Sequence, residues 1–362
     1  NLWGTLKDPV FLCATDMIEQ YIELGKGWNW ISFSVKPKVM TTNTVFANAD
    51  GLVTIIKSQA KNDQYYESYG AWYINMALNN REMYALNATE PFTLSVTGQR
   101  VNPADEPISF NKNWNWIGYN GQRVISLSEA LTGMSPVTGD LIKGQRGVAY
   151  YDEYEWVGSM GTLKPGQGYK AKNTTSESRT FTYPPSAANI TAVHQARRTF
   201  DDETATPRVF HPVDYRNYPA NMVLIARVVR NGMPLADAEL GVFAGSECRE
   251  AVVTDGQGMV YITIPGDAAT KLTFRVASDG EVFNCSESLN YETDAVVGTP
   301  RAPFLIDLAQ ATGITELDYR TISTSDNCYD LQGRRIDSST FNVQRSTLKK
   351  GVYIINGQKQ VK

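Results

Sequence analysis

Residues able to carry acid–base or nucleophilic chemistry are scarce in this sequence. A Ser–His–Asp or Cys–His arrangement needs a positioned imidazole, and the chain has two histidines, His194 and His211. Both lie in a stretch punctuated by proline, which seldom holds a rigid catalytic site. The sequence contains no HExxH or Cys/His zinc spacing, no GxSxG elbow and no phosphate-binding glycine loop. We therefore expect a protein that is not an enzyme and that holds no metal or cofactor.

Carboxylates leave one catalytic option open, because glycoside hydrolysis needs only two of them. Small repeated β domains seldom form the deep cleft that such an enzyme uses. The acidic run at 201–203 lacks the spacing of an EF-hand loop. A solvated acidic turn explains that run better than a Ca²⁺ site does.

Aromatic side chains carry the most specific functional hypothesis. The chain has 7 Trp, 19 Tyr and 13 Phe, and exposed rings can anchor interfaces or stack on sugars. Trp72 and Trp156 each follow a tyrosine-rich turn, in which Tyr69 and Tyr154 lie. We predict that these four residues lie at an exposed rim and contact a ligand.

Two lysines complete the candidate ligand-binding set. Lys57 and Lys143 recur in register, each two residues before a glutamine, Gln59 and Gln145. They are candidates for polar residues shared by two equivalent sites. A structural hydrogen-bonding role is the stronger explanation for these repeated polar residues.

The elements that position these residues come from an internal duplication. Trp28-Asn29-Trp30 recurs as Trp114-Asn115-Trp116, 86 residues later (114 − 28). Lys57 and Lys143 have the same offset (143 − 57). Rare tryptophans in register indicate a duplicated domain of about 85 residues. Both faces of the Trp-Asn-Trp strand carry bulky side chains, so we expect the strand to be covered on both sides. Its tryptophans are candidates for ligand contact, but filling the two cores is the stronger explanation for them.

Local signals predict smaller elements within each copy. Ser126 and Glu129 have capping-box spacing and Gly133 suits a helix end, so one short helix is expected there. The second copy enters a late strand through a Pro-Gly turn at 165–166. The matching stretch of the first copy, 78–84, has neither residue type, and we expect a left-handed asparagine in its turn.

The second half of the chain changes character twice. Polar, proline-punctuated sequence at 186–218 is typical of a linker. Short apolar runs then alternate with turn residues every 10 residues or roughly so, which is typical of a β-sandwich. Asn231-Gly232 predicts a tight hairpin within it, and Cys248 and Cys285 form either a disulfide or two buried thiols. The predicted strands of this region are 221–229, 239–244, 249–254, 259–264, 272–277 and 304–308.

Overall charge narrows the classes of partner. Lys and Arg total 34 against 38 Asp and Glu, giving a formal net charge of −4, which offers no basic field for nucleic acid. No stretch approaches the roughly 18 apolar residues of a membrane-spanning helix. The chain begins at Asn1 without a signal peptide, so we expect either that processing removed its start or that it is part of a longer protein. Residues 9–14 predict a first strand.

The last 50 residues or so carry a family resemblance. The segments "YDLQGRRI" and "LKKGVYIINGQK" resemble the C-terminal sorting-type domains of secreted Bacteroidetes proteins. The resemblance implies export, handling by a type IX-like secretion machinery, and surface attachment or release. The residues that match this pattern are Tyr329, Asp330, Gly333, Arg334, Gly351, Val352, Tyr353 and Lys362.

A second resemblance concerns the rest of the chain. The Trp-Asn-Trp repeats and the segment "ADAELGVFAGSECR" are similar to modules of large Bacteroidetes surface proteins. This similarity implies a cell-surface or adhesion role and names no ligand.

Together these patterns predict a mainly β, multi-domain protein, in which a tandem repeat of a small β-rich domain precedes an Ig-like β-sandwich and a short C-terminal β unit. The expected function is non-catalytic binding or adhesion outside the cell or on its outer surface, with a glycan or protein as ligand. Two alternatives are an accessory region of a larger secreted hydrolase and a structural spacer. The predicted boundaries are 1–103 for the first repeat with its N-terminal strand, 104–185 for the second repeat, 186–218 for the linker, 219–310 for the sandwich and 311–362 for the sorting-like unit.

Overall fold

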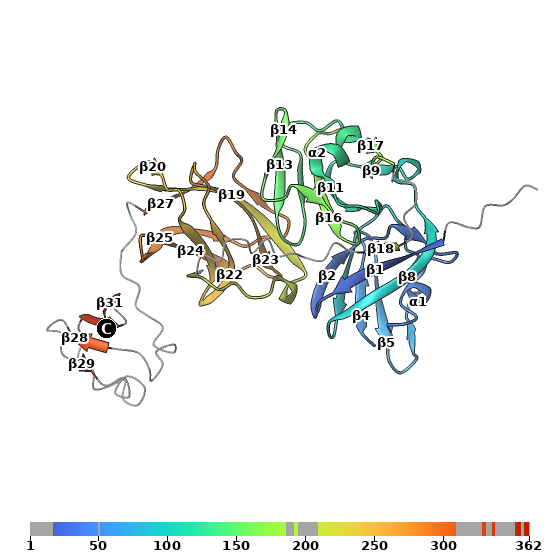
Figure 1. Ribbon diagram of the computed structural model, residues 1–362, viewed down its shortest axis with the longest axis horizontal. Coiled ribbons are helices and arrows are strands. Elements are labelled where there is room, and N and C mark those ends of the chain that lie inside the picture. The colour runs from blue at the N-terminus through green and yellow to red at the C-terminus, as the bar shows by residue number, and fades with distance from the viewer. Residues whose placement is uncertain are drawn as a thin grey trace, which may run out of the picture.

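The computed structural model describes residues 17–49, 51–185 and 209–308, together with short strand segments at 192–194, 328–330, 335–336, 352–355 and 358–361. The described residues form mainly antiparallel sheets with a few short helical turns. In Figure 1 the two repeats lie together, the first in blue and cyan and the second in green, and a yellow and orange sandwich lies against them. The strand predicted at 9–14 lies outside the described residues.

The first repeat is built on a five-stranded sheet. One face of this sheet carries Ile31, Ile56 and Leu86 into the core, because side chains alternate between the faces of a strand. Helix α1 (Thr42–Val45) packs on that core. The strands lie in the order β2 (Gly27–Ile31), β7 (Tyr84–Ala88), β4 (Val53–Lys57), β5 (Asn62–Tyr66) and β6 (Ala71–Trp72). A second sheet, in the order β18 (Ala192–His194), β1 (Met17–Leu24), β8 (Phe92–Arg100) and β3 (Val35–Lys36), supplies Ile22, Val35 and Leu94 to the same core.

The second repeat has the same main sheet. Trp114 pairs with Lys172 as Trp28 pairs with Asn87, so strand order and register are both duplicated. The strands lie in the order β10 (Asn113–Gly118), β16 (Gly168–Asn173), β12 (Leu141–Lys143), β13 (Val148–Asp152) and β14 (Glu155–Gly158). Helix α2 (Leu127–Ala130) and two small strand pairs, β9 (Ile108–Phe110) with β17 (Arg179–Phe181) and β11 (Ile125–Ser126) with β15 (Thr162–Leu163), close its core.

Of the local predictions for the repeats, the helix cap is confirmed, while the helix end and the asparagine turn are wrong. The cap of α2 is confirmed, because the Ser126 hydroxyl accepts a hydrogen bond from the Glu129 amide. Gly133 lies inside a 3₁₀ turn, Thr132–Met134, instead of ending the helix. The left-handed asparagine expected in 78–84 is wrong, since no residue of that described stretch has a positive φ. The Asn79 side chain instead accepts from the amides of Arg81 and Glu82, which satisfies the turn without backbone strain.

Residues 219–308 form a sandwich of two sheets. Asn231 and Gly232 have φ of 54° and 76°, as the tight hairpin predicted there requires. Cys248 and Cys285 are free thiols. The first sheet centres on β19 (Ala220–Arg230), paired with β20 (Met233–Pro234), β23 (Met259–Gly266), β26 (Val296–Val297) and β27 (Phe304–Asp307). The second sheet has the order β22 (Glu247–Val253), β21 (Glu239–Ala244), β24 (Lys271–Ser278) and β25 (Glu281–Asn290).

The predicted strands of the sandwich are found, with ends shifted by a few residues. Strand β25 (Glu281–Asn290) was not predicted. Its residues are half-buried or exposed, so it lacks the apolar run that marked the other strands.

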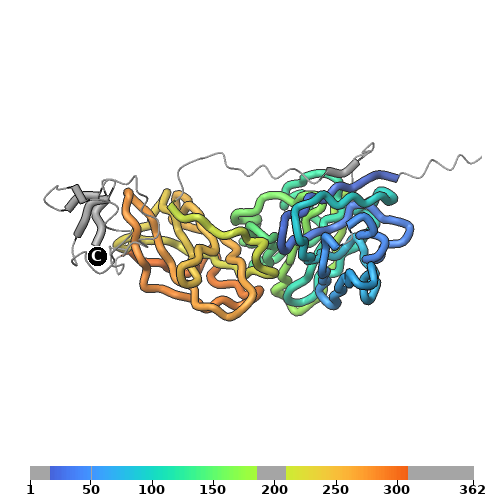
Figure 2. The backbone as a smooth tube through the Cα atoms, turned by 90° about the horizontal axis from the view of Figure 1, so that it is seen from below, coloured from blue at the N-terminus to red at the C-terminus, as the bar shows by residue number. Residues whose placement is uncertain are grey.

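The stretch predicted as a linker divides between its neighbours. Ala192–His194 adds a parallel strand to β1 of the first repeat. Phe210 packs against Phe243 of the sandwich, and the 3₁₀ turn Tyr215–Asn217 contacts β2. Figure 2 shows the sandwich at one end of the repeat pair.

The C-terminal unit contributes four short strands. Their order is β29 (Arg335–Ile336), β28 (Cys328–Asp330), β30 (Val352–Ile355) and β31 (Gln358–Val361). Ile355 pairs with Gln358 at the end of the antiparallel pair β30 and β31, and the two residues between these strands lie outside the described residues.

Candidate functional site

The two repeats bind each other through their repeated glutamines. The Gln145 side chain accepts from the Trp30 amide and donates to the Trp28 carbonyl, each at 2.9 Å. Gln59 makes the reciprocal bonds with the second repeat, to the Trp116 amide at 2.9 Å and the Trp114 carbonyl at 2.8 Å. Strands β2 and β10 are edge strands, so each glutamine covers backbone groups that would otherwise be unpaired. The structural role expected of the glutamines is confirmed.

The asparagine of each Trp-Asn-Trp segment also has a structural role. Asn29 exchanges hydrogen bonds with the backbone of Gly25 and donates to the Gly27 carbonyl. Asn115 makes the same three bonds to Asn111 and Asn113. This asparagine fixes the turn that precedes the strand, which accounts for its repetition.

Both candidate lysines stack on tryptophans. Lys57 Nζ lies 4.8 Å from the centre of the Trp28 ring, and Lys143 Nζ lies 4.5 Å from that of Trp114. The lysines differ in exposure, since Lys57 is half-buried and Lys143 is fully buried. Lys143 therefore cannot contact a ligand as its side chain now lies, and its prediction as a contact residue is wrong for this conformation.

A loop of the sandwich covers Lys143. Asp294 Oδ1 lies 2.8 Å from Lys143 Nζ, and its carboxylate also binds the buried Lys170 at 2.9 Å. The Asp294 carbonyl accepts from the Trp114 indole at 2.9 Å, while the Asn221 carbonyl accepts from Lys143 at 2.8 Å. Repeat and sandwich are thus joined by a polar cluster with two buried lysines, which lies beside an apolar contact.

Burial controls the protonation of this cluster. It lowers the pKa of Lys143 to about 7, although the Asp294 carboxylate acts in the opposite direction. Burial also lowers the pKa of Lys170. Burial alone would raise the pKa of Asp294, but the two ammonium groups outweigh it and hold that pKa below its usual value.

The four paired tryptophans lie at domain contacts and not in the repeat cores. Trp30 packs with Met83 and Ala85, beside Trp28 and Trp116, and the core of each repeat is made of other residues. The expectation that these rings fill the cores is therefore wrong. The opposite face of each strand already fills the core, so the tryptophans point to whatever the outer face meets.

The predicted aromatic rim of the first repeat is exposed only in part. Trp72 is 5% exposed, so its expected exposure is wrong. It packs against Phe46 and Tyr65 and supports the hairpin from below. Tyr69 is 82% exposed, as predicted.

Three tyrosines gather on this hairpin, and we call Tyr66, Tyr69 and Tyr73 the tyrosine tip. The Tyr66 ring contacts the rings of Tyr69 and Tyr73 at centroid distances of 6.3 and 5.7 Å. Tyr73 is 78% exposed, and the neighbouring Ile74 is 58% exposed. Tyr66 and Tyr73 were not predicted as site residues, although both stand within a few residues of Tyr69 in the sequence.

A buried carboxylate holds the tyrosine tip in place. Asp63 is 1% exposed. Its oxygens accept hydrogen bonds from the amides of Ile74 and Met76, each at 2.9 Å, and from the Thr42 hydroxyl at 2.8 Å. The chain directly after Tyr73 is thereby fixed, and the Tyr73 amide donates to the Gln64 carbonyl at 2.9 Å. The exposed rings are therefore presented by a rigid support.

The corresponding hairpin of the second repeat differs. Tyr154 is 88% exposed, but Asp152 occupies the position of Tyr66, as the strand pairing shows. Arg301 of the sandwich binds Asp152 at 3.0 Å and Glu153 at 2.6 Å. Trp156, predicted at the rim, is half-buried on the core of its repeat. This hairpin therefore anchors the sandwich and carries one isolated exposed tyrosine.

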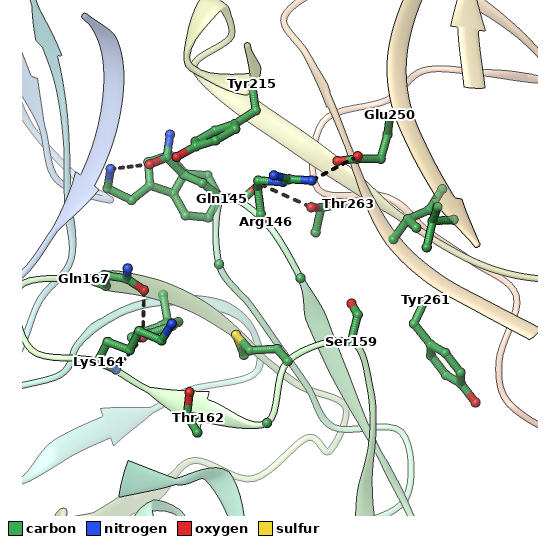
Figure 3. Close-up of a pocket in the computed structure, with 18 of the residues that line it drawn as sticks. Gln145, Arg146, Ser159, Thr162, Lys164, Gln167, Tyr215, Glu250, Tyr261 and Thr263 are labelled. Carbon is green, nitrogen blue, oxygen red and sulfur yellow. Dashed lines mark hydrogen bonds and ion pairs between the residues drawn. The ribbon is translucent and has the colours of Figure 1, made fainter. Parts of the chain in front are cut away.

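A cleft of about 600 Å³ opens where the second repeat meets the sandwich. Figure 3 shows Arg146 reaching Glu250 across one side, at 3.4 Å, while Ser159, Thr162 and Lys164 line the opposite wall. Its volume lies within the range of small-ligand sites. Among the described lining residues Glu250 is the one carboxylate, so the paired carboxylates of a glycosidase are not brought together here.

The described residues lack two further kinds of site. They contain no group of three or more His, Cys, Asp or Glu side chains placed to bind a metal ion. Within the same part of the chain, no helix has the length and apolar character needed to cross a membrane.

Comparison with known proteins assigns no family. No family model matches the chain, and no curated protein matches its sequence. One solved structure that matches is that of the Bacillus anthracis TIE protein, with 11% sequence identity and a TM-score of 0.18. That alignment covers 97% of this chain and 66% of the TIE protein, so the chain spans about two thirds of its length. A TM-score this low supports no inference about fold or function.

Proposed function

We propose that this chain is a non-catalytic binding protein of the extracellular space or the outer cell surface, which recognises a glycan or a protein through the tyrosine tip. The observation that carries the proposal is the exposure of Tyr69 and Tyr73, at 82% and 78%, on a hairpin fixed by buried hydrogen bonds. Clustered aromatic rings on a soluble protein are unfavourable in water unless a partner covers them.

The chemistry of tyrosine supports recognition. Its ring provides contact area at a low cost in side-chain entropy, and its hydroxyl supplies a hydrogen bond at the edge. The second repeat strengthens the argument, because its hairpin binds the sandwich through acidic residues and has no such cluster. The duplication has thus left one hairpin structural and the other free for a ligand.

The proposal that the protein is exported is based on the C-terminal unit. Its resemblance to sorting-type domains supports a surface or secreted location, and the pairing of β30 with β31 is compatible with that resemblance. Handling by a type IX-like machinery is part of the same proposal.

The test is binding of the purified chain to a panel of glycans and extracellular matrix proteins. A Tyr69→Ala/Tyr73→Ala variant is compared with Tyr154→Ala, which removes an equally exposed but isolated ring. We expect a loss of at least about tenfold in affinity for the double variant, as for an interface hot spot, and no loss for the control. Absence of any ligand in the panel, or equal loss in both variants, contradicts the proposal.

A further inference from the structure

The duplicated repeats present the same lysine–tryptophan pair twice, once covered and once uncovered. In the second repeat, Trp114 and Lys143 hold the sandwich loop that carries Asp294. In the first repeat, Trp28 and Lys57 have the same arrangement, with the ammonium 4.8 Å from the ring centre. The covered copy shows directly which chemical groups this pair binds.

Three groups of the second repeat bind the Asp294 loop, and two of them, Lys143 and Trp114, form the repeated pair. The Lys143 ammonium binds the Asp294 carboxylate at 2.8 Å, and the Trp114 indole N–H donates to the Asp294 backbone carbonyl at 2.9 Å. Asp294 has a φ of 63°, a left-handed conformation that turns its side chain and carbonyl toward the repeat together. The pair therefore recognises a carboxylate and a carbonyl of one residue in a tight loop.

The uncovered copy retains both donors. The strand register places Lys57 at the position of Lys143, and Trp28 at that of Trp114. Among the described residues, neither the Lys57 ammonium nor the Trp28 indole N–H has a hydrogen-bond or ion-pair partner. Both side chains are half-buried, so they are partly ordered by packing and still reach solvent.

The surroundings of the uncovered pair are more polar. Leu141, Val148 and Tyr150 pack against the sandwich in the second repeat, and the strand pairing places Ile55, Asn62 and Gln64 at their positions. Asn62 and Gln64 are exposed. In Figure 1, β13 lies beside β19 of the sandwich, whereas β5, its counterpart, lies away from it. Such a face suits a reversible partner better than a permanent one, because polar surface tolerates exposure when the partner leaves.

We propose that Trp28 and Lys57 form a second docking site, which binds an aspartate-bearing loop of a partner protein. The loop takes the place that the Asp294 loop takes on the second repeat. Its carboxylate binds the Lys57 ammonium and its backbone carbonyl accepts from the Trp28 indole. One lysine faces one carboxylate here, because Ala85 stands at the position of Lys170. This site is separate from the tyrosine tip and does not depend on it.

The probe is a cyclised peptide with the sequence of residues 290–296, and the matched probe carries Asp294→Asn. The full chain is treated with each peptide and a carbodiimide, which joins a lysine amine to a bound carboxylate, and the modified lysine is identified by mass spectrometry. We expect coupling at Lys57 that falls at least about tenfold with the Asn probe and in a Lys57→Gln chain. A Lys61→Gln chain, which loses an exposed lysine four residues away, should couple as the wild type does.

A second measurement distinguishes specific binding of the peptide from nonspecific coupling to lysine. Chemical shifts of the tryptophan indole groups, recorded during peptide titration, should change at Trp28 with the Asp probe and remain unchanged with the Asn probe. Equal coupling at Lys57 and Lys61, or no shift at Trp28 at millimolar peptide, overturns the proposal. A concentration-dependent dimer that Lys57→Gln abolishes, without peptide coupling, assigns the surface to a second copy of the chain and also overturns it.

Discussion

Replacing Asp294 by Asn tests whether charge joins the sandwich to the second repeat. The Asp294 carboxylate lies 2.8 Å from Lys143 Nζ and 2.9 Å from Lys170 Nζ, and these lysine side chains are 0% and 3% exposed. Asn has a similar shape and tolerates the left-handed φ of 63°. The substitution therefore removes the charge and leaves the packing and backbone nearly unchanged.

The expected loss in the free energy of unfolding depends on the contacts that the Asn side chain keeps. The Asn side-chain oxygen can still accept one lysine hydrogen bond, but two buried ammonium groups lose their counter-ion. Breaking a buried ion pair by removing one partner costs about 3–5 kcal/mol, and the retained oxygen places the expected loss near 3 kcal/mol at pH 6. The loss should become smaller at pH 9, because the pKa of Lys143 is about 7 and this lysine is then neutral in both proteins. A packing defect would not show this dependence on pH.

Urea unfolding followed by tryptophan fluorescence measures the effect, since Trp114 lies at the contact and Lys170 stacks on Trp116. The chain has several domains, so the transition that reports these tryptophans must be analysed separately. The control is Asp279→Asn, which removes an exposed carboxylate from Arg230 and should shift no transition. An equal shift in both variants, or a shift of Asp294→Asn that is the same at pH 6 and pH 9, refutes the reasoning.

Two further predictions concern the same contacts. The folded pKa of Lys143 is about 7, below the value of about 10.4 for an unfolded lysine. Between these values the unfolded chain binds more protons, so stability should rise with pH by up to about 1.4 kcal/mol per unit. Urea midpoints at pH 7 and 9 measure this rise, and a Lys143→Met chain that keeps the same slope contradicts the prediction. Gln145→Ala should destabilise the repeat pair by about 1–3 kcal/mol, because it leaves an amide and a carbonyl of an edge strand unpaired. Gln59→Ala should cost less, because Gln59 makes the same bonds but is more exposed. Hydrogen exchange of the Trp30 and Trp116 amides measures both effects, and unchanged protection of both amides would show that the glutamines do not hold the strands.

The sequence alone determined the repeated architecture and most of the strands. Duplicated Trp-Asn-Trp segments predicted duplicated sheets, because strand register and turn chemistry are local properties that survive duplication. Asn231-Gly232 predicted its hairpin for the same reason, since the turn type depends on the φ values of two residues. The strand Glu281–Asn290 escaped because neither of its faces is fully buried.

The candidate site was predicted only in part. Tyr69 and Tyr154 are exposed as expected, while Trp72 is buried beneath Phe46. Nothing local distinguishes Trp72 from Trp156, because both follow a tyrosine-rich turn. Burial of Trp72 depends on a helical turn 26 residues earlier (72 − 46), whose position only the folded chain defines.

The tertiary structure decided which repeated face is covered. Alternation along a strand shows that Trp28 and Trp114 point out of their cores, but it does not show what they meet, since that partner comes from a distant part of the chain. Lys57 and Lys143 both follow an isoleucine and precede a glutamine by two residues, and they differ in burial because one sandwich covers one of two equivalent faces. A trace of that choice is present in the sequence, where apolar Val148 replaces polar Asn62 at equivalent positions. Its meaning depends on the docked domain, because local patterns specify the faces of a strand and only long-range packing specifies their neighbours.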